Sequence, residues 1–119
     1  MQLLPRILGG ITVAYSLLIT VRPEVLARPC GLTGPDGRAS PGVRTLIGGI
    51  GVRDVAIGSA MMCAPRGPAL RSAVAARVFS DAADAVVFGA RLPAREQRPK
   101  VAGFAVFWAG LCAVSARWA

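Results

Sequence analysis

Four apolar runs, separated by clusters of Pro, Gly and Arg, dominate the pattern of this chain. Each run is long enough for a helix and is bounded by residues that break helices, so we expect helices over about 3–21, 45–64, 69–90 and 100–117. The longest connection, residues 22–44, is rich in Pro and Gly, and 23–27 within it are expected to form a short interfacial turn. Such helices and connections predict an all-α up-and-down four-helix bundle, a single domain over 1–119.

The amino-acid composition indicates that this bundle lies in a membrane. At 54% hydrophobic residues, a chain of 119 residues is too apolar for an ordinary soluble domain. Each run approaches the roughly 20 residues that span a bilayer core, so an integral, multi-pass protein is predicted. The first run is expected to be retained, since no A-x-A cleavage site follows it. In an alternative architecture, the helix over 69–90 lies in the membrane interface, because its charges form a single stripe.

The basic residues indicate how the chain crosses the membrane. With 14 Lys+Arg against 6 Asp+Glu, the net charge of +8 could mark a nucleic-acid binder. The cations lie mostly in the connections, however, without interleaved aromatic residues, which favours the lipid bilayer as partner and no nucleic acid. The connections after the first and third helices hold Arg22, Arg28, Arg38, Arg44, Arg91, Arg95, Arg98 and Lys100; the other end holds Arg6, Arg66, Arg71 and Arg117. The positive-inside rule then predicts an inner (plasma) membrane protein with non-cytoplasmic termini.

Metal and cofactor chemistry is not suggested by the sequence. Cys30, Cys63 and Cys112 are widely spaced and no His is present, so neither a zinc site nor a disulfide framework is predicted. The three cysteines are interpreted as small apolar fillers. The glycines of the second helix, four residues between 48 and 58, are interpreted as helix-contact positions, because no strand precedes them and no Lys-Ser/Thr follows.

Five ionisable residues stand where lipid is expected. Arg53 and Asp54 interrupt the second helix, and Arg77, Asp81 and Asp84 share one face of the third at spacings of four and three. Unpaired, each would cost about 2.5–3.5 kcal/mol at the membrane centre, so we expect the five to meet inside the bundle. Two cations against three acids leave a formal charge of −1, which one proton or a cationic ligand could neutralise.

Neighbouring positions extend this candidate site. Phe88 continues the charged face of the third helix, and Asp54 lies on a face of small residues with Gly51 and Gly58. The first helix carries a small polar stripe, and Tyr15 lies beside it. The members of that stripe are Gly9, Thr12, Ser16 and Thr20. We therefore take Tyr15, Thr12, Ser16 and Phe88 as candidate substrate-binding residues.

The residues 51–58 form a G-x-R-D-x-x-x-G motif that follows a Pro/Gly-rich loop. With Asp81 and Asp84 in the next helix, this segment resembles an uncharacterised family of small bacterial and fungal four-helix membrane proteins, broadly similar to DoxX-like proteins. The resemblance covers most of the chain, from the first helix to the fourth. It implies a four-helix membrane fold and the importance of Arg53, Asp54 and the two acids of the third helix, and it implies no activity.

Three functions fit these residues. The first is binding of a lipophilic small molecule with cofactor-free acid–base catalysis of the epoxide hydrolase, cyclase or isomerase type. In it Asp54, Asp81 and Asp84 supply the acid and base, and Arg53 and Arg77 orient them. The second is a proton-coupled transport subunit, which requires a homo-oligomer because one chain has few walls for a pathway. The third is a non-catalytic assembly partner, in which the buried pairs only fix helix register.

Overall fold

The computed structural model describes residues 3–119 and is all-helical over that range, without strands. The long helices are α1 (Leu3–Val21), α3 (Pro41–Cys63), α4 (Pro68–Arg91) and α5 (Arg98–Ser115), and α2 (Glu24–Ala27) is a single turn. Two 3₁₀ turns, Arg95–Gln97 and Ala116–Trp118, flank α5. The first two residues of the predicted 1–119 domain lie outside the described range.

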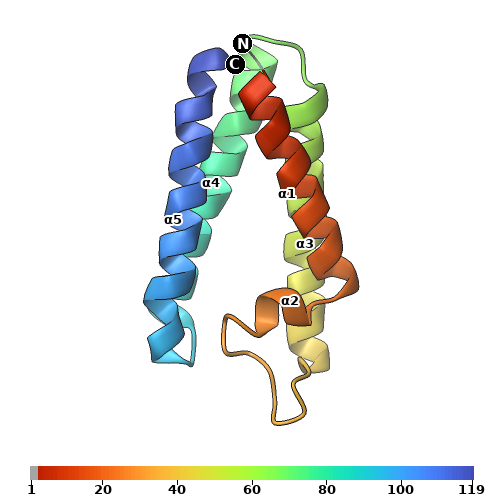
Figure 1. The fold of residues 1–119 in the computed structure, drawn as a ribbon, viewed down its shortest axis with the longest axis vertical. Helices are drawn as coiled ribbons and strands as arrows, with labels where there is room; N and C mark the ends of the chain where they lie inside the picture. The colour runs from red at the N-terminus through yellow and green to blue at the C-terminus, as the bar shows by residue number, and fades with distance from the viewer. Residues whose placement is uncertain (1–2) are drawn as a thin grey trace.

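The long helices alternate in direction, so that the start of α1 and the end of α5 lie at one end of the molecule (Figure 1). α1 packs along α3, α4 packs along α5, and α3 also contacts α4. The two pairs diverge toward the opposite end, where α2 lies (Figure 1). The divergence leaves a space between the two helix pairs. Side chains from all five helices line this space.

Most predicted helix bounds agree with the structure, and the start of the second helix is wrong. The first helix has the predicted bounds, the third is one residue longer at each end, and the fourth begins two residues early and closes with a 3₁₀ turn. α3 begins at Pro41 rather than at residue 45, because Ser40 accepts a hydrogen bond from the backbone N–H of Val43 and proline fits the first helical turn. The short turn expected at 23–27 is present as α2, one residue shorter.

Glycine allows the close contact of α1 with α3. A Cβ on Gly58 would lie 2.8 Å from the Gly9 carbonyl oxygen, and one on Gly9 would lie 2.7 Å from the Gly58 carbonyl oxygen. Further along, Gly51 faces Thr20 and the Ser16 carbonyl oxygen of α1. The predicted contact role is therefore confirmed for Gly51 and Gly58 and wrong for Gly48 and Gly49, where a Cβ would meet nothing within 4 Å.

Two apolar clusters hold the helices together at different depths. Near the chain ends, Leu8, Met61, Val74 and Cys112 pack from the four long helices. Near α2, the cluster is formed by Ile19, Ala27, Ala39 and Ile47. The guanidinium of Arg6 closes the end of α3 by donating to the carbonyl oxygens of Met62 and Ala64, at 2.6 and 2.9 Å.

Three segments are long and apolar enough to cross a membrane: Leu3–Val21, Pro41–Cys63 and Arg95–Trp118. α4 is not among them, because Arg77, Asp81 and Asp84 occupy its middle. The side of α4 that carries Phe79, Val86 and Val87 is nevertheless apolar and exposed, at 75%, 70% and 48%. α4 therefore has an apolar outer face and a charged inner face.

Candidate functional site

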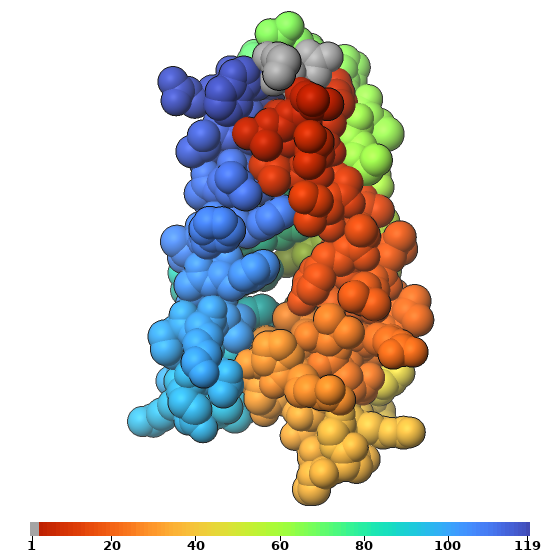
Figure 2. Space-filling model, viewed as in Figure 1, coloured from red at the N-terminus to blue at the C-terminus, as the bar shows by residue number. Residues whose placement is uncertain are grey.

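A cavity of about 200 Å³ lies between the two apolar clusters. Its lining comes from all five helices and is mostly apolar. The lining residues are Ile11, Thr12, Tyr15, Ser16, Ile19, Leu26, Ile50, Asp54, Arg77, Asp81, Asp84, Phe88, Val101, Phe104, Ala105 and Trp108. Ile11 and Tyr15 of α1 and Phe104 of α5 both line the cavity and are exposed, so it opens between these two helices, where Figure 2 shows a hollow above α2.

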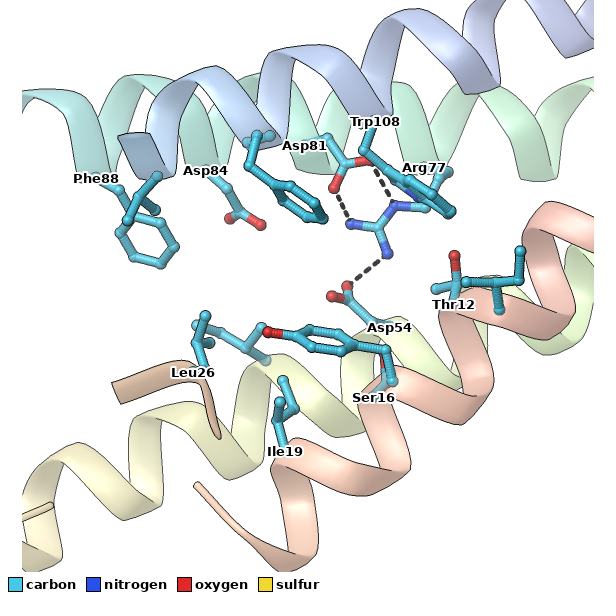
Figure 3. A pocket seen from close by; sticks show the side chains of 16 residues that line it. Thr12, Ser16, Ile19, Leu26, Asp54, Arg77, Asp81, Asp84, Phe88 and Trp108 are labelled. Atoms are coloured by element: carbon cyan, nitrogen blue, oxygen red, sulfur yellow. Dashed lines mark hydrogen bonds and ion pairs between the residues drawn. The ribbon is translucent and has the colours of Figure 1, made fainter. Parts of the chain in front are cut away.

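Arg77 is the central cation of the site. Its side chain is only 3% exposed, and its Nε and Nη2 atoms donate to the two oxygens of Asp81 at 3.0 and 2.5 Å. Its Nη1 lies 3.0 Å from Oδ1 of Asp54, across the gap between α4 and α3 (Figure 3). A buried guanidinium is thus matched by two carboxylates, which is the arrangement that offsets its desolvation.

Arg53 extends this network on the α3 side. Its Nη1 and Nη2 atoms donate to the two oxygens of Asp84 at 3.3 and 2.8 Å, and its Nε donates to Oδ1 of Asp54 at 2.8 Å. The side chain is 36% exposed and is not among the lining residues. The five charges therefore form one network, as the spacing predicts, with Asp54 between the two arginines.

Asp54 differs from the other two acids because one of its carboxylate oxygens accepts no hydrogen bond. Both oxygens of Asp81 and both oxygens of Asp84 accept hydrogen bonds from one arginine each. Oδ1 of Asp54 faces both arginines, whereas its Oδ2 has no partner among residues 3–119. In Figure 3 only one of the two Asp54 oxygens is joined by a dashed line. A ligand in the cavity therefore has one carboxylate oxygen available to it.

The polar stripe of α1 contributes a second unsatisfied group. Thr12 is 6% exposed, and its hydroxyl is the one fully buried side-chain polar atom in the described part of the chain that lacks a hydrogen-bond partner. Thr20, predicted as part of the same stripe, instead donates to the Ser16 carbonyl oxygen at 2.7 Å and does not line the cavity. Tyr15, Ser16 and Phe88 line the cavity, as the candidate site predicts.

Sequence reasoning missed the apolar walls. Phe104 and Trp108, which the sequence analysis does not include in the candidate site, line the cavity from α5, and Leu26 of α2 lines its side nearest α2 (Figure 3). The i, i+4 spacing of Phe104 and Trp108 is the signal that could have identified a common face. Leu26 gave no comparable signal, because its place depends on how the connection folds back.

Glu24 fixes α2, and with it Leu26, against the long helices. One of its carboxylate oxygens accepts from the backbone N–H of Ala39 at 3.0 Å and from Nη1 of Arg44 at 2.8 Å. The Ala39 N–H, together with Arg44, holds the pKa of the Glu24 carboxyl below its ordinary value. This carboxylate therefore ties the start of the connection to its end.

The other candidate chemical groups lie outside the network. Cys30 and Cys112 are buried and Cys63 is exposed, and all three are unpaired thiols, so the filler interpretation fits only the first two. Within residues 3–119, no group of three or more His, Cys, Asp or Glu side chains has a geometry that could hold a metal ion. The cavity-lining groups available for chemistry on a ligand include the carboxylate of Asp54, the guanidinium of Arg77 and the hydroxyls of Thr12, Tyr15 and Ser16.

Comparison of the chain with protein-family models, with curated proteins and with solved structures finds no match. The resemblance to DoxX-like proteins therefore stays a prediction.

Proposed function

We propose that this protein is an integral membrane protein, an up-and-down four-helix bundle whose Arg/Asp cavity binds a lipophilic small molecule. The observation that carries the proposal is the cavity itself, which has a charged network on one side and aromatic and aliphatic walls on the others. Closed ion pairs without a cavity would have favoured a purely structural role. Few polar groups on an apolar wall are typical of small-molecule sites.

Helix lengths and exposed faces support the membrane setting. At 1.5 Å per residue, α1 with 19 residues and α3 with 23 residues are about 28 and 34 Å long, close to the roughly 30 Å hydrocarbon core. We take α4 as the fourth membrane-spanning helix, because its charged side chains pair inside the bundle while its outer face is apolar. This arrangement favours a spanning α4 over an interfacial one. The α2 end, with most of the cations, is placed on the cytoplasmic side.

The opening between α1 and α5 supports entry from the bilayer. Phe104 is 63% exposed and Ile11 is 49% exposed, so the rim of the opening is apolar. Because the cavity lies midway along the helices, a ligand dissolved in lipid reaches it without crossing water. An apolar protein cavity of about 150 Å³ is large enough for benzene, so about 200 Å³ takes a small substituted aromatic group.

A binding experiment tests this proposal. In the Trp118→Phe background, Trp108 is the remaining tryptophan and reports on the cavity wall. With the protein in lipid nanodiscs, we expect toluene and benzyl alcohol to change Trp108 fluorescence saturably. Ala105→Phe, which fills the cavity from its α5 wall, should remove the saturable part. Ala113→Leu, at an exposed α5 position, is the control that should keep it. A response linear in probe and equal in all variants would contradict the proposal.

Acid–base catalysis on the bound molecule is the second candidate function. The specific observation is that Asp54 alone keeps a free carboxylate oxygen at the cavity, with Arg77 3.0 Å from its other oxygen. Asp54 Oδ2 is then placed to accept a proton from a water whose oxygen attacks an epoxide carbon. The C–O bond of the ring at that carbon breaks, and the resulting alkoxide takes the proton back from Asp54, which gives a diol. Incubation with styrene oxide and chromatography of the diol would test this. Asp54→Asn should abolish turnover, Asp36→Asn in the exposed connection should leave it unchanged, and equal turnover in both would refute it.

A further inference from the structure

The charged network is not neutral, and its excess charge can be located. Arg77 and Asp81 form a two-bond pair, and Arg53 and Asp84 form another, so two cations and two acids are matched. Asp54 is the remaining acid. It shares one oxygen with both arginines and presents the other without a partner. By this pairing the formal charge of −1 falls on Asp54, whose carboxylate lies at the wall of the mostly apolar cavity.

An independent group points into the same cavity. Thr12 is only 6% exposed and lines the cavity. Its hydroxyl has no hydrogen-bond partner among the described residues. Figure 3 shows this hydroxyl directed from α1 toward the space below Arg77 and Trp108. A buried hydroxyl without a hydrogen bond is costly, at about 1–3 kcal/mol, so a ligand that bonds to it restores that loss.

The walls around these groups suit a cation. Phe88 lies on the side of Asp84 and Trp108 on the side of Arg77 (Figure 3), and Phe104 of α5 also lines the cavity. Aromatic faces attract organic cations, and the attraction is strongest where water is excluded. An anion, by contrast, would meet a network whose formal charge is −1 in a medium of low dielectric.

We propose that the ligand of this cavity is a lipophilic organic cation of the protonated-amine class. Its ammonium donates a hydrogen bond to Asp54 Oδ2, and its hydrocarbon part lies against Phe88, Phe104 and Trp108. The Asp54 charge that the arginines leave unmatched is then neutralised by the ligand. This inference rests on the proposed function, because it names the ligand class of the same cavity.

Four probes of nearly equal size and different charge test the proposal: benzylamine, benzyl alcohol, toluene and benzoate. We expect saturable Trp108 fluorescence changes at neutral pH with benzylamine bound about tenfold or more tightly than toluene, benzyl alcohol in between and benzoate weakest. Signals from the cavity-filled Ala105→Phe protein are subtracted to remove partitioning into lipid. Asp54→Asn should abolish the preference for the amine and keep toluene binding.

If Asp54→Asn does not fold, aniline, which is uncharged at neutral pH, provides the test in the native protein. Aniline should bind about as weakly as toluene and at least about tenfold more weakly than benzylamine. Binding of toluene and benzyl alcohol without a preference for benzylamine, or a preference that survives in Asp54→Asn or is shared by aniline, overturns the inference and leaves the proposed function standing. Failure of all four probes to bind overturns both.

Discussion

Nη1 of Arg77 lies 3.0 Å from Oδ1 of Asp54, and this ion pair joins the middle of α4 to the middle of α3. Arg53 and Asp84 make a second connection between the same two helices in the reverse sense, with the cation on α3 and the acid on α4. The α1–α3 pair is thereby fixed to the α4–α5 pair at the depth of the cavity. Charge pairing and cavity shape therefore depend on each other.

Removing the central cation should destabilise the fold. Arg77→Met leaves Asp54 and Asp81 without their buried guanidinium partner, so we expect a loss of about 3–5 kcal/mol of unfolding free energy. Denaturant unfolding in detergent micelles measures it. Arg71→Met, on the same helix at an exposed position, should change stability little. Equal losses in the two variants would show that Arg77 is not held in a buried network.

A matched pair of glycines tests the contact between α1 and α3. Gly58→Ala would place a Cβ 2.8 Å from the Gly9 carbonyl oxygen and 2.9 Å from a Val13 methyl, so it should cost about 1–3 kcal/mol. A Cβ on Gly49 meets nothing within 4 Å. Gly49→Ala should therefore stabilise the helix by about 0.5–1 kcal/mol. Shifts of the same sign in thermal unfolding would contradict the described packing.

Glu24 should make the α2 connection sensitive to acid. Its carboxyl has a pKa below the ordinary value of 4.5, so its stabilisation is complete above that value and is lost as the pH falls through the lower, folded-state pKa. Between about pH 6 and pH 3, the exchange of the Ala39 amide, relative to its intrinsic rate, should rise in the native protein. Glu24→Gln should show raised exchange at both pH values. A native protein without this change would refute the role of Glu24.

The native cysteines offer a test of orientation. Cys63 is exposed at the end of α3 that lies beside the chain termini, whereas Cys30 and Cys112 are buried. If the termini are non-cytoplasmic, a membrane-impermeant maleimide should label right-side-out vesicles without permeabilisation, and Cys63→Ala should remove the label. Labelling that requires permeabilisation would place this end in the cytoplasm.

Much of the fold could be predicted from local patterns in the sequence. The helix Leu3–Val21 follows from an uncharged run between Arg6 and Arg22, and the convergence of the five charges follows from the cost of leaving them in lipid. The start of α3 was missed because Pro41 and Gly42 were counted as breakers. At the first turn, however, proline loses no hydrogen bond and Ser40 supplies the cap.

The details of the site depend on distances between helices, which sequence spacing does not contain. Asp54 and Arg53 lie about 100° apart around an ideal helix, yet the flexible arginine side chain bends back to contact Asp54 at 2.8 Å. The cavity exists because the two helix pairs diverge, and Leu26 lines its side nearest α2. Neither the divergence nor the position of α2 has a local signature.

The central claim is that the Arg/Asp network faces a cavity open to lipid. Photolabelling in competition with a cavity ligand tests this claim most directly. Protein in nanodiscs is labelled with a trifluoromethyl phenyldiazirine, with and without excess toluene, and the adducts are mapped by mass spectrometry. We predict that adducts on Phe104 and Trp108 fall when toluene is added, whereas those on the outward-facing Phe79 do not. Adducts that respond equally at all three positions would contradict the account.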